Sequence, residues 1–332
     1  MVDSAFAPEV IIWTDPHRAA MVSRILDLLG AGVRAIGVGG PRSAELDDLA
    51  RRLDCPQDDD FRKLLIDRPS AFVLLATMSR IAPDDLIAAI EQRSIVLCLD
   101  PPAADFDDLS PFRGKHAGTG RQQRLIYLPA FMDCHGWLSA ADPVEVLGDP
   151  QMVSYASMGR RGECSLFARL YDGWRTILAC LDMPVAVSAS LSGGNGDVPD
   201  DARAITGYIG AHARLPNGAT ALLQASDAAS RVTRWVNALS AQGQLYVDDL
   251  SYELFGPDGR MIDQAQAATG SRDLADLAAA VWTRLLDRTE NPPAQGSLDR
   301  DMQTLACCRA TLLSARTGEP ENPRRLLELA AT

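Results

Sequence analysis

The stretch that decides the fold runs from Ala76 to Pro102 and reads ATMSRIAPDDLIAAIEQRSIVLCLDPP. It continues an apolar run, Ala71 to Thr77, that is short and bounded in the way typical of a buried strand. Pro83 stands where the first turn of a helix tolerates proline, and aliphatic residues then recur at helical spacing. A second apolar run, SIVLCL, ends at Asp100. The stretch therefore predicts strand, helix and strand, one βαβ unit of a parallel sheet.

The segment before this stretch repeats the same alternation. Glu9 to Trp13 reads as a strand, and Asp15-Pro16 reads as the N-cap and first position of a helix. Arg34 to Val38 reads as the next strand, and Ser43 is placed to cap the helix that follows. Together these elements predict a Rossmann-type α/β domain, the architecture of dinucleotide-binding proteins.

The second half of the chain has a different pattern. Met152 to Met158 reads as a strand, Ser165 to Leu181 as a helix, and six short runs between Val185 and Phe255 as strands separated by turns. Two helices are expected to close the chain. We place the boundary near Arg124, and expect a Rossmann-type domain over 1–123 and an α+β domain with a large, mostly antiparallel open sheet over 124–332.

Composition narrows the classes of partner. The 332 residues carry a formal net charge of −12, which disfavours phosphate backbones and anionic membrane surfaces, so we expect neither nucleic acid nor membrane as a partner. No secretory signal and no apolar run long enough to span a bilayer is visible. Seven cysteines without CxxC spacing fit reduced thiols, and we expect a cytoplasmic protein. Cys134-His135 has no evident partner ligand, so we expect no metal.

The chain also resembles a family, the Gfo/Idh/MocA oxidoreductases. In that family a strand ends in an A-T-P-like turn and the strand after the next helix ends in E-K-P. Here Ala76-Thr77-Met78 and Leu99-Asp100-Pro101 stand at the same separation. Further fragments that match are LDMPVAVSAS, RLPNGATALLQAS, AQGQLYVDD and LLSARTGEP, so the resemblance covers nearly the whole chain. It implies a sugar or cyclitol dehydrogenase scaffold that assembles through its open sheet, as a homo-oligomer or a heteromer.

The cofactor positions that the resemblance implies depart from the family. The three glycines of the G-x-G-x-x-G turn fall on Trp13, Asp15 and Arg18. At the end of the second strand, Gly40, Arg42 and Ser43 resemble the version that binds NADP. The residues that the resemblance assigns to the cofactor are Thr14, Gly40, Arg42, Ser43 and Thr77. We expect no NAD(P) or only weak NAD(P) binding, with NADP slightly preferred.

The catalytic positions depart as well. By the resemblance, the family lysine falls on Asp100 and the family histidine on Asp172, and the substrate side chains implied are Arg80 and Arg175. Two carboxylates facing one site could act as acid and base. The plainer interpretation has Asp172 on the solvent side of its helix, opposite the apolar face, and Asp100 as an ordinary turn residue.

Three functions remain open on the sequence. The first is a catalytically degenerate relative that binds a small, sugar-like polar molecule or serves as partner subunit of an active homologue. The second is a working NAD(P)-dependent oxidoreductase with a diverged cofactor loop. The third is a cofactor-free hydrolase or lyase that uses Asp100 and Asp172.

Overall fold

The computed structural model describes residues 7–112, 124–193, 198–268, 270–287 and 298–330. The chain forms two compact units. The first comprises Met1–Ala103, Asp107–Pro129 and Leu274–Leu298, and the second comprises Ala104–Phe106, Ala130–Asp273 and Asp299–Thr332. This division differs from the expected one, because the chain changes unit after Pro129 and later returns a helix to the first unit. In the described ranges, no helix is long and apolar enough to cross a membrane.

The first unit is a doubly wound α/β domain. Its six strands are all parallel, in the order β3-β2-β1-β4-β5-β6. They are β1 (Glu9–Trp13), β2 (Arg34–Gly39), β3 (Gln57–Asp58), β4 (Phe72–Leu75), β5 (Ile95–Cys98) and β6 (Leu125–Tyr127). The helices are α1 (Ala19–Leu29), α2 (Ala44–Arg52), α3 (Phe61–Asp67), α4 (Pro83–Glu91) and α8 (Leu274–Leu286). The predicted βαβ unit is therefore β4, α4 and β5.

Local capping explains where these helices begin. Pro83 is the first residue of α4, and the Asp85 carboxylate accepts a hydrogen bond from the Ala82 amide at 2.8 Å. The Ser43 hydroxyl caps α2 by accepting from the Leu46 amide at 3.3 Å. Both helix starts were predicted from the sequence and are confirmed.

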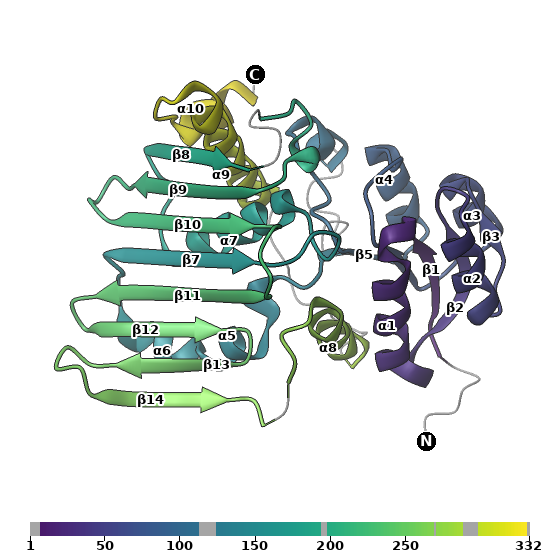
Figure 1. The fold of residues 1–332 in the computed structure, drawn as a ribbon, viewed down its shortest axis with the longest axis horizontal. Helices are drawn as coiled ribbons and strands as arrows, with labels where there is room; N and C mark the ends of the chain where they lie inside the picture. The colour runs from purple at the N-terminus through teal and green to yellow at the C-terminus, as the bar shows by residue number, and fades with distance from the viewer. Residues whose placement is uncertain (1–6, 113–123, 194–197, 269, 288–297, 331–332) are drawn as a thin grey trace. The chain divides into compact units, whose positions relative to one another are not determined.

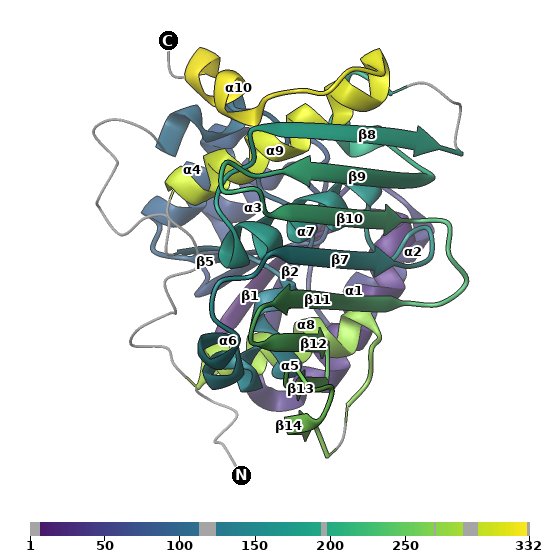
Figure 2. The same ribbon diagram turned by 90° about the vertical axis from the view of Figure 1, so that its left-hand side faces the viewer.

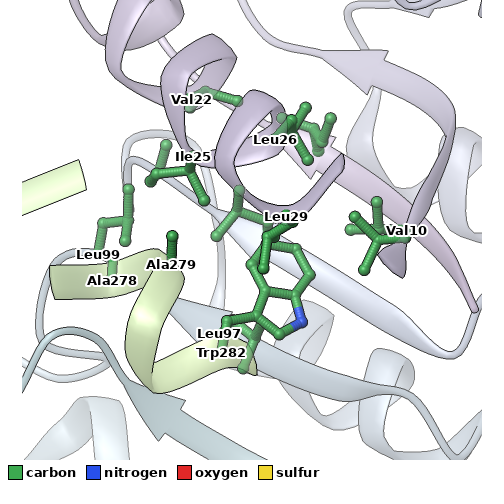
Figure 3. Close-up of a cluster of buried hydrophobic side chains, with 14 of the residues drawn as sticks. Val10, Val22, Ile25, Leu26, Leu29, Leu97, Leu99, Ala278, Ala279 and Trp282 are labelled. Carbon is green, nitrogen blue, oxygen red and sulfur yellow. The ribbon is translucent and has the colours of Figure 1, made fainter. Parts of the chain in front are cut away.

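One face of this sheet is covered by a helix from far along the chain. Trp282 of α8 is fully buried, and its ring lies 5.7 Å from that of Phe72 on β4. Figure 3 shows the Trp282 side chain among residues of α1 and the sheet, including Leu29 and Leu97. Figure 1 shows α8 lying beside α1. These apolar contacts place α8 in the first unit.

The second unit is built on an eight-stranded sheet in the order β14-β13-β12-β11-β7-β10-β9-β8 (Figure 1). Only β7 and β10 pair in parallel. The strands are β7 (Met152–Met158), β8 (Ala186–Ser192), β9 (Tyr208–Arg214), β10 (Thr220–Ser226), β11 (Thr233–Ser240), β12 (Gly243–Asp248), β13 (Ser251–Phe255) and β14 (Met261–Gln266). The mostly antiparallel sheet expected from the sequence is confirmed.

The helices of this unit are α5 (His135–Ser139), α6 (Ala141–Leu147), α7 (Leu166–Cys180), α9 (Leu298–Thr317) and α10 (Pro323–Ala330). Figure 2 shows α7 and α9 behind the sheet, whose other face carries no helix in the described chain. The segment after Pro129 forms a 3₁₀ turn followed by α5 and α6. The exposed edge strand β14 was not predicted from the sequence.

Candidate functional site

Trp13 is the last residue of β1 and lies at the carboxyl end of the parallel strands, where doubly wound sheets bind their ligands. Its side chain is 1% exposed, and its indole nitrogen donates to the Ser79 carbonyl at 3.1 Å. The ring meets Phe61 edge-on, with 5.4 Å between centroids. A Cβ on Gly39 of the neighbouring strand would lie 2.4 Å from the indole. Glycine at this position therefore makes the room that the Trp13 ring fills.

Asp15 caps a helix, as predicted from the sequence. Its carboxylate accepts from the Arg18 amide at 3.0 Å, and Pro16 occupies the first position of the 3₁₀ turn that leads into α1. The carboxylate thus satisfies an amide at the start of this helix.

Arg18 forms a buried ion pair with Asp100. The two nitrogen–oxygen distances are 2.8 and 3.1 Å, and the residues are 7% and 8% exposed. The same guanidinium donates to the Ala76 carbonyl. Arg18 follows β1, Ala76 follows β4 and Asp100 follows β5, so one side chain spans the carboxyl ends of three strands. The strand order reverses between β1 and β4, which is where a doubly wound sheet opens its ligand crevice.

The interpretation of Asp100 as an ordinary turn residue was therefore wrong. Its carboxylate is buried and paired with a cation 82 positions away. A signal for this pair existed in the sequence: the third glycine position and the lysine position of the family both changed, and to opposite charges.

Three other predicted cofactor residues, Thr14, Thr77 and Gly40, form hydrogen bonds or close contacts with residues of the first unit. Thr14 is fully buried and its hydroxyl donates to the Asp15 carbonyl at 3.2 Å, while the Thr77 hydroxyl accepts from the Ser79 amide at 3.2 Å. Gly40 has φ +148°, and a Cβ there would lie 2.0 Å from the Thr14 carbonyl oxygen.

At the end of β2, two predicted cofactor residues also have partners of their own. The Arg42 guanidinium, 85% exposed, donates to the Asp59 carboxylate at 2.9 Å. The Ser43 hydroxyl is the cap of α2. Neither side chain requires a ligand to account for its position.

In the second unit, Asp172 is 2% exposed, so its expected place on the solvent side of its helix was wrong. Most of α7 is buried on every side. One Asp172 oxygen accepts from the Phe131 amide at 2.9 Å. The other accepts from the Tyr155 hydroxyl at 2.8 Å and from the Arg234 guanidinium at 3.1 Å.

Arg234 ties this network together. It is 3% exposed and also bonds Asp249, at 2.7 and 2.9 Å, and the Cys134 sulfur, at 3.0 Å. Burial raises the pKa of the Cys134 thiol and of the Asp249 carboxyl, so the thiol is a neutral packed group. The sequence analysis did not single out Arg234 or Asp249. Arg234 lies two residues before Val236 on β11, so both side chains point to the buried face of the sheet. A charged residue at such a position indicates a buried partner.

The predicted substrate residues lie in different surroundings. Arg80 is exposed in the first unit, with φ +64°, an uncommon conformation for a side chain of its size. Arg175 is 8% exposed on α7. One turn earlier on α7, the Tyr171 hydroxyl donates to Asp301 at 2.9 Å, and burial raises the pKa of Asp301.

The described residues contain no group of three or more histidine, cysteine, aspartate or glutamate side chains arranged to hold a metal ion. His135 is exposed, and its ring lies 3.3 Å from the Ser139 hydroxyl. Its neighbour Cys134 faces Arg234 instead.

The first unit has a doubly wound parallel sheet and the second has an open eight-stranded sheet. Together they match the two-domain fold of the Gfo/Idh/MocA oxidoreductases. An oxidoreductase from Agrobacterium radiobacter, solved with NAD+, L-tartaric acid and magnesium, has a TM-score of 0.72 at 14% identity, over 96% of this chain and 99% of that one. A levoglucosan dehydrogenase solved with NADH and levoglucosan has a TM-score of 0.70 at 11% identity, over 95% and 99%.

A putative myo-inositol dehydrogenase from Sinorhizobium meliloti 1021 has a TM-score of 0.65 at 14% identity, over 95% of this chain and 99% of that one. No family model and no curated protein sequence matches the chain. The similarity is thus one of fold, carried at low sequence identity.

Proposed function

We propose that this protein is a catalytically degenerate relative of sugar and cyclitol dehydrogenases. It would bind NAD(P) weakly or not at all, and would bind a small, sugar-like polar molecule or serve as partner subunit of an active homologue. The observation that carries the proposal is the buried Arg18–Asp100 ion pair, which spans the strand ends where a dinucleotide would lie.

The residues at the implied dinucleotide site do not fit a pyrophosphate. Such a group normally sits on free amides at a helix amino terminus, approached closely over glycine. Here the Asp15 carboxylate already bonds the Arg18 amide. A like-charge contact at about 4 Å costs on the order of a few kcal/mol at an effective dielectric near 20. Arg42 could offset little of this, because an exposed ion pair contributes only about 0–1 kcal/mol.

Acid–base catalysis by two carboxylates gains no support from the site. Both oxygens of Asp172 are hydrogen-bonded, and the residue is almost fully buried. A catalytic acid or base must reach the proton that it transfers. Asp100 is likewise buried and paired with Arg18.

Assembly through the open face of the eight-stranded sheet is part of the proposal. Trp235 and Tyr246 stack there with centroids 6.1 Å apart, and Leu222 is 37% exposed. Large uncovered apolar faces are seldom left to solvent. We expect a homo-oligomer or a heteromer at micromolar concentration by light scattering; a monomer would count against this part.

The nucleotide test is calorimetry with NAD+, NADH, NADP+ and NADPH at low salt. We expect dissociation constants no tighter than the millimolar range. A levoglucosan dehydrogenase titrated in the same buffer provides the positive control, and Arg42→Gln tests the preference for NADP. A micromolar constant for any nucleotide would refute the proposal and favour an active oxidoreductase with a diverged cofactor loop.

A further inference from the structure

Arg169 is a buried cation that lacks most of its hydrogen bonds. It lies on α7 and is 1% exposed. One terminal nitrogen donates to the Ser157 hydroxyl at 3.2 Å, but Nε and the other terminal nitrogen are buried without a partner in the described chain. Asp172, three positions along α7, already bonds Tyr155 and Arg234. A buried guanidinium without an anion is strongly unfavourable, so its presence needs an explanation.

The guanidinium lies at the amino-terminal end of α7. Side chains on a helix lean toward its amino terminus, and a Cβ on Gly159, which begins the loop before α7, would lie 1.9 Å from Nη2 of Arg169. The helix has 15 residues, and the Ser165 hydroxyl caps it by accepting from the Ala168 amide at 3.1 Å. Arg169 is the fourth residue of α7, so its charge belongs to the same first turn as the positive end of the helix dipole.

Further arginines are exposed in the loop that Gly159 begins and in the loop bonded to it. Arg160 and Arg161 are exposed in the loop before α7, and Arg231 is exposed in the loop before β11. The two loops are bonded together, by Arg160 Nε to the Ser230 carbonyl at 3.0 Å and by the Ala229 amide to the Gly159 carbonyl at 2.9 Å.

These arginines collect positive charge on a chain whose formal net charge is −12. In the same two loops, acids are fewer. Glu163 accepts from the Arg160 amide at 3.3 Å, and Asp227 is buried and accepts from the Gly207 amide at 2.7 Å. The local field thus favours an anion, against the sign of the protein as a whole.

We propose that the amino-terminal end of α7 binds an oxyanion with the charge and shape of a phosphate group, carried by a small phosphorylated molecule. Arg161 and Arg231 would contact the oxygens from the surface, and Arg169 would stabilise the bound charge from beneath. Phosphate suits the site because helix amino termini and clustered arginines both favour compact, multiply charged oxyanions. A carboxylate shares this chemistry, so the test includes one. The site lies within the second unit and does not depend on the proposed loss of NAD(P).

The test is calorimetry and thermal unfolding of the full chain with inorganic phosphate, at ionic strength held constant with sodium chloride. We expect wild type to bind phosphate with a constant of about 1 mM or tighter. Arg169→Met should bind at least tenfold more weakly, yet unfold without phosphate at or above the wild-type temperature, because methionine fills the space and removes an unpaired charge. The double variant R161Q/R231Q should also lose binding, whereas Arg214→Gln, an exposed arginine on β9, should bind as wild type does.

Absence of phosphate binding to wild type would overturn the proposal, as would equal binding by Arg169→Met and wild type. Should Arg169→Met not fold, R161Q/R231Q decides alone, since its altered side chains are exposed. Gluconate serves as the carboxylate probe, and tighter binding of gluconate than of phosphate would overturn the phosphate assignment.

Discussion

Separating Arg18 from Asp100 should destabilise the first unit strongly. The pair has nitrogen–oxygen distances of 2.8 and 3.1 Å, and its side chains are 9% and 11% exposed. Breaking a buried ion pair leaves one uncompensated charge and typically costs about 3–5 kcal/mol. We therefore expect Asp100→Ala to lower the free energy of unfolding by about 3 kcal/mol, and Arg18→Met by a similar amount. The double variant should lose less than the sum, with a coupling of about 1–3 kcal/mol.

Urea unfolding followed by circular dichroism measures this cycle, with a second probe to test whether the two units unfold together. The exposed Arg42–Asp59 pair is the matched control, and Asp59→Ala should leave the transition unchanged within error. A loss below about 1 kcal/mol for Asp100→Ala, or strict additivity in the double variant, would show that the pair is not the buried interaction described here.

Two further outcomes follow from buried groups of the second unit. Asp172→Ala should lower the free energy of unfolding by about 3 kcal/mol, because Arg234 and Tyr155 lose a buried acceptor. Asp258→Ala, in an exposed turn, is the control and should have no measurable effect. Equal effects of the two substitutions in urea titrations would contradict this expectation. Burial raises the pKa of Asp301 above its usual 3.8, so the folded chain keeps this proton to a higher pH than the unfolded chain does. The free energy of unfolding should then fall as the pH rises from about 3.8 through the raised pKa, and Asp301→Asn should flatten that fall; an unchanged slope would refute the assignment.

Features set by neighbouring residues could be predicted from the sequence. The bounds of β1, the cap of α2 and the proline start of α4 depend on short-range rules of strand length and helix termini. The two-unit architecture followed from the change in element pattern along the chain and from the family resemblance.

Features that depend on residues far apart in the chain were not predicted by these short-range rules. Asp172 was expected in solvent because its helix has an apolar stripe, but α7 is covered on all sides, so the helical pattern carried no information about this residue. Asp100 was interpreted without Arg18, because no local rule joins two positions 82 residues apart, and only the opposite charges at the two family positions pointed to the pair. β14 is an exposed edge strand, and the alternation that marks a half-buried strand is missing from it.

The return of α8 to the first unit constrains the order in which the protein can be made. Six buried residues of α8 complete a core whose other buried members all precede Pro129: Ala275, Ala278, Ala279, Val281, Trp282 and Leu285. A growing chain that has emerged only to Pro129 lacks these side chains, so the apolar residues of α1 and β4 that they cover would be left exposed. We therefore expect a fragment that ends near residue 129 to aggregate or to require a chaperone. The same fragment with residues 274–286 joined by a flexible linker should be the smallest version of the first unit that folds alone.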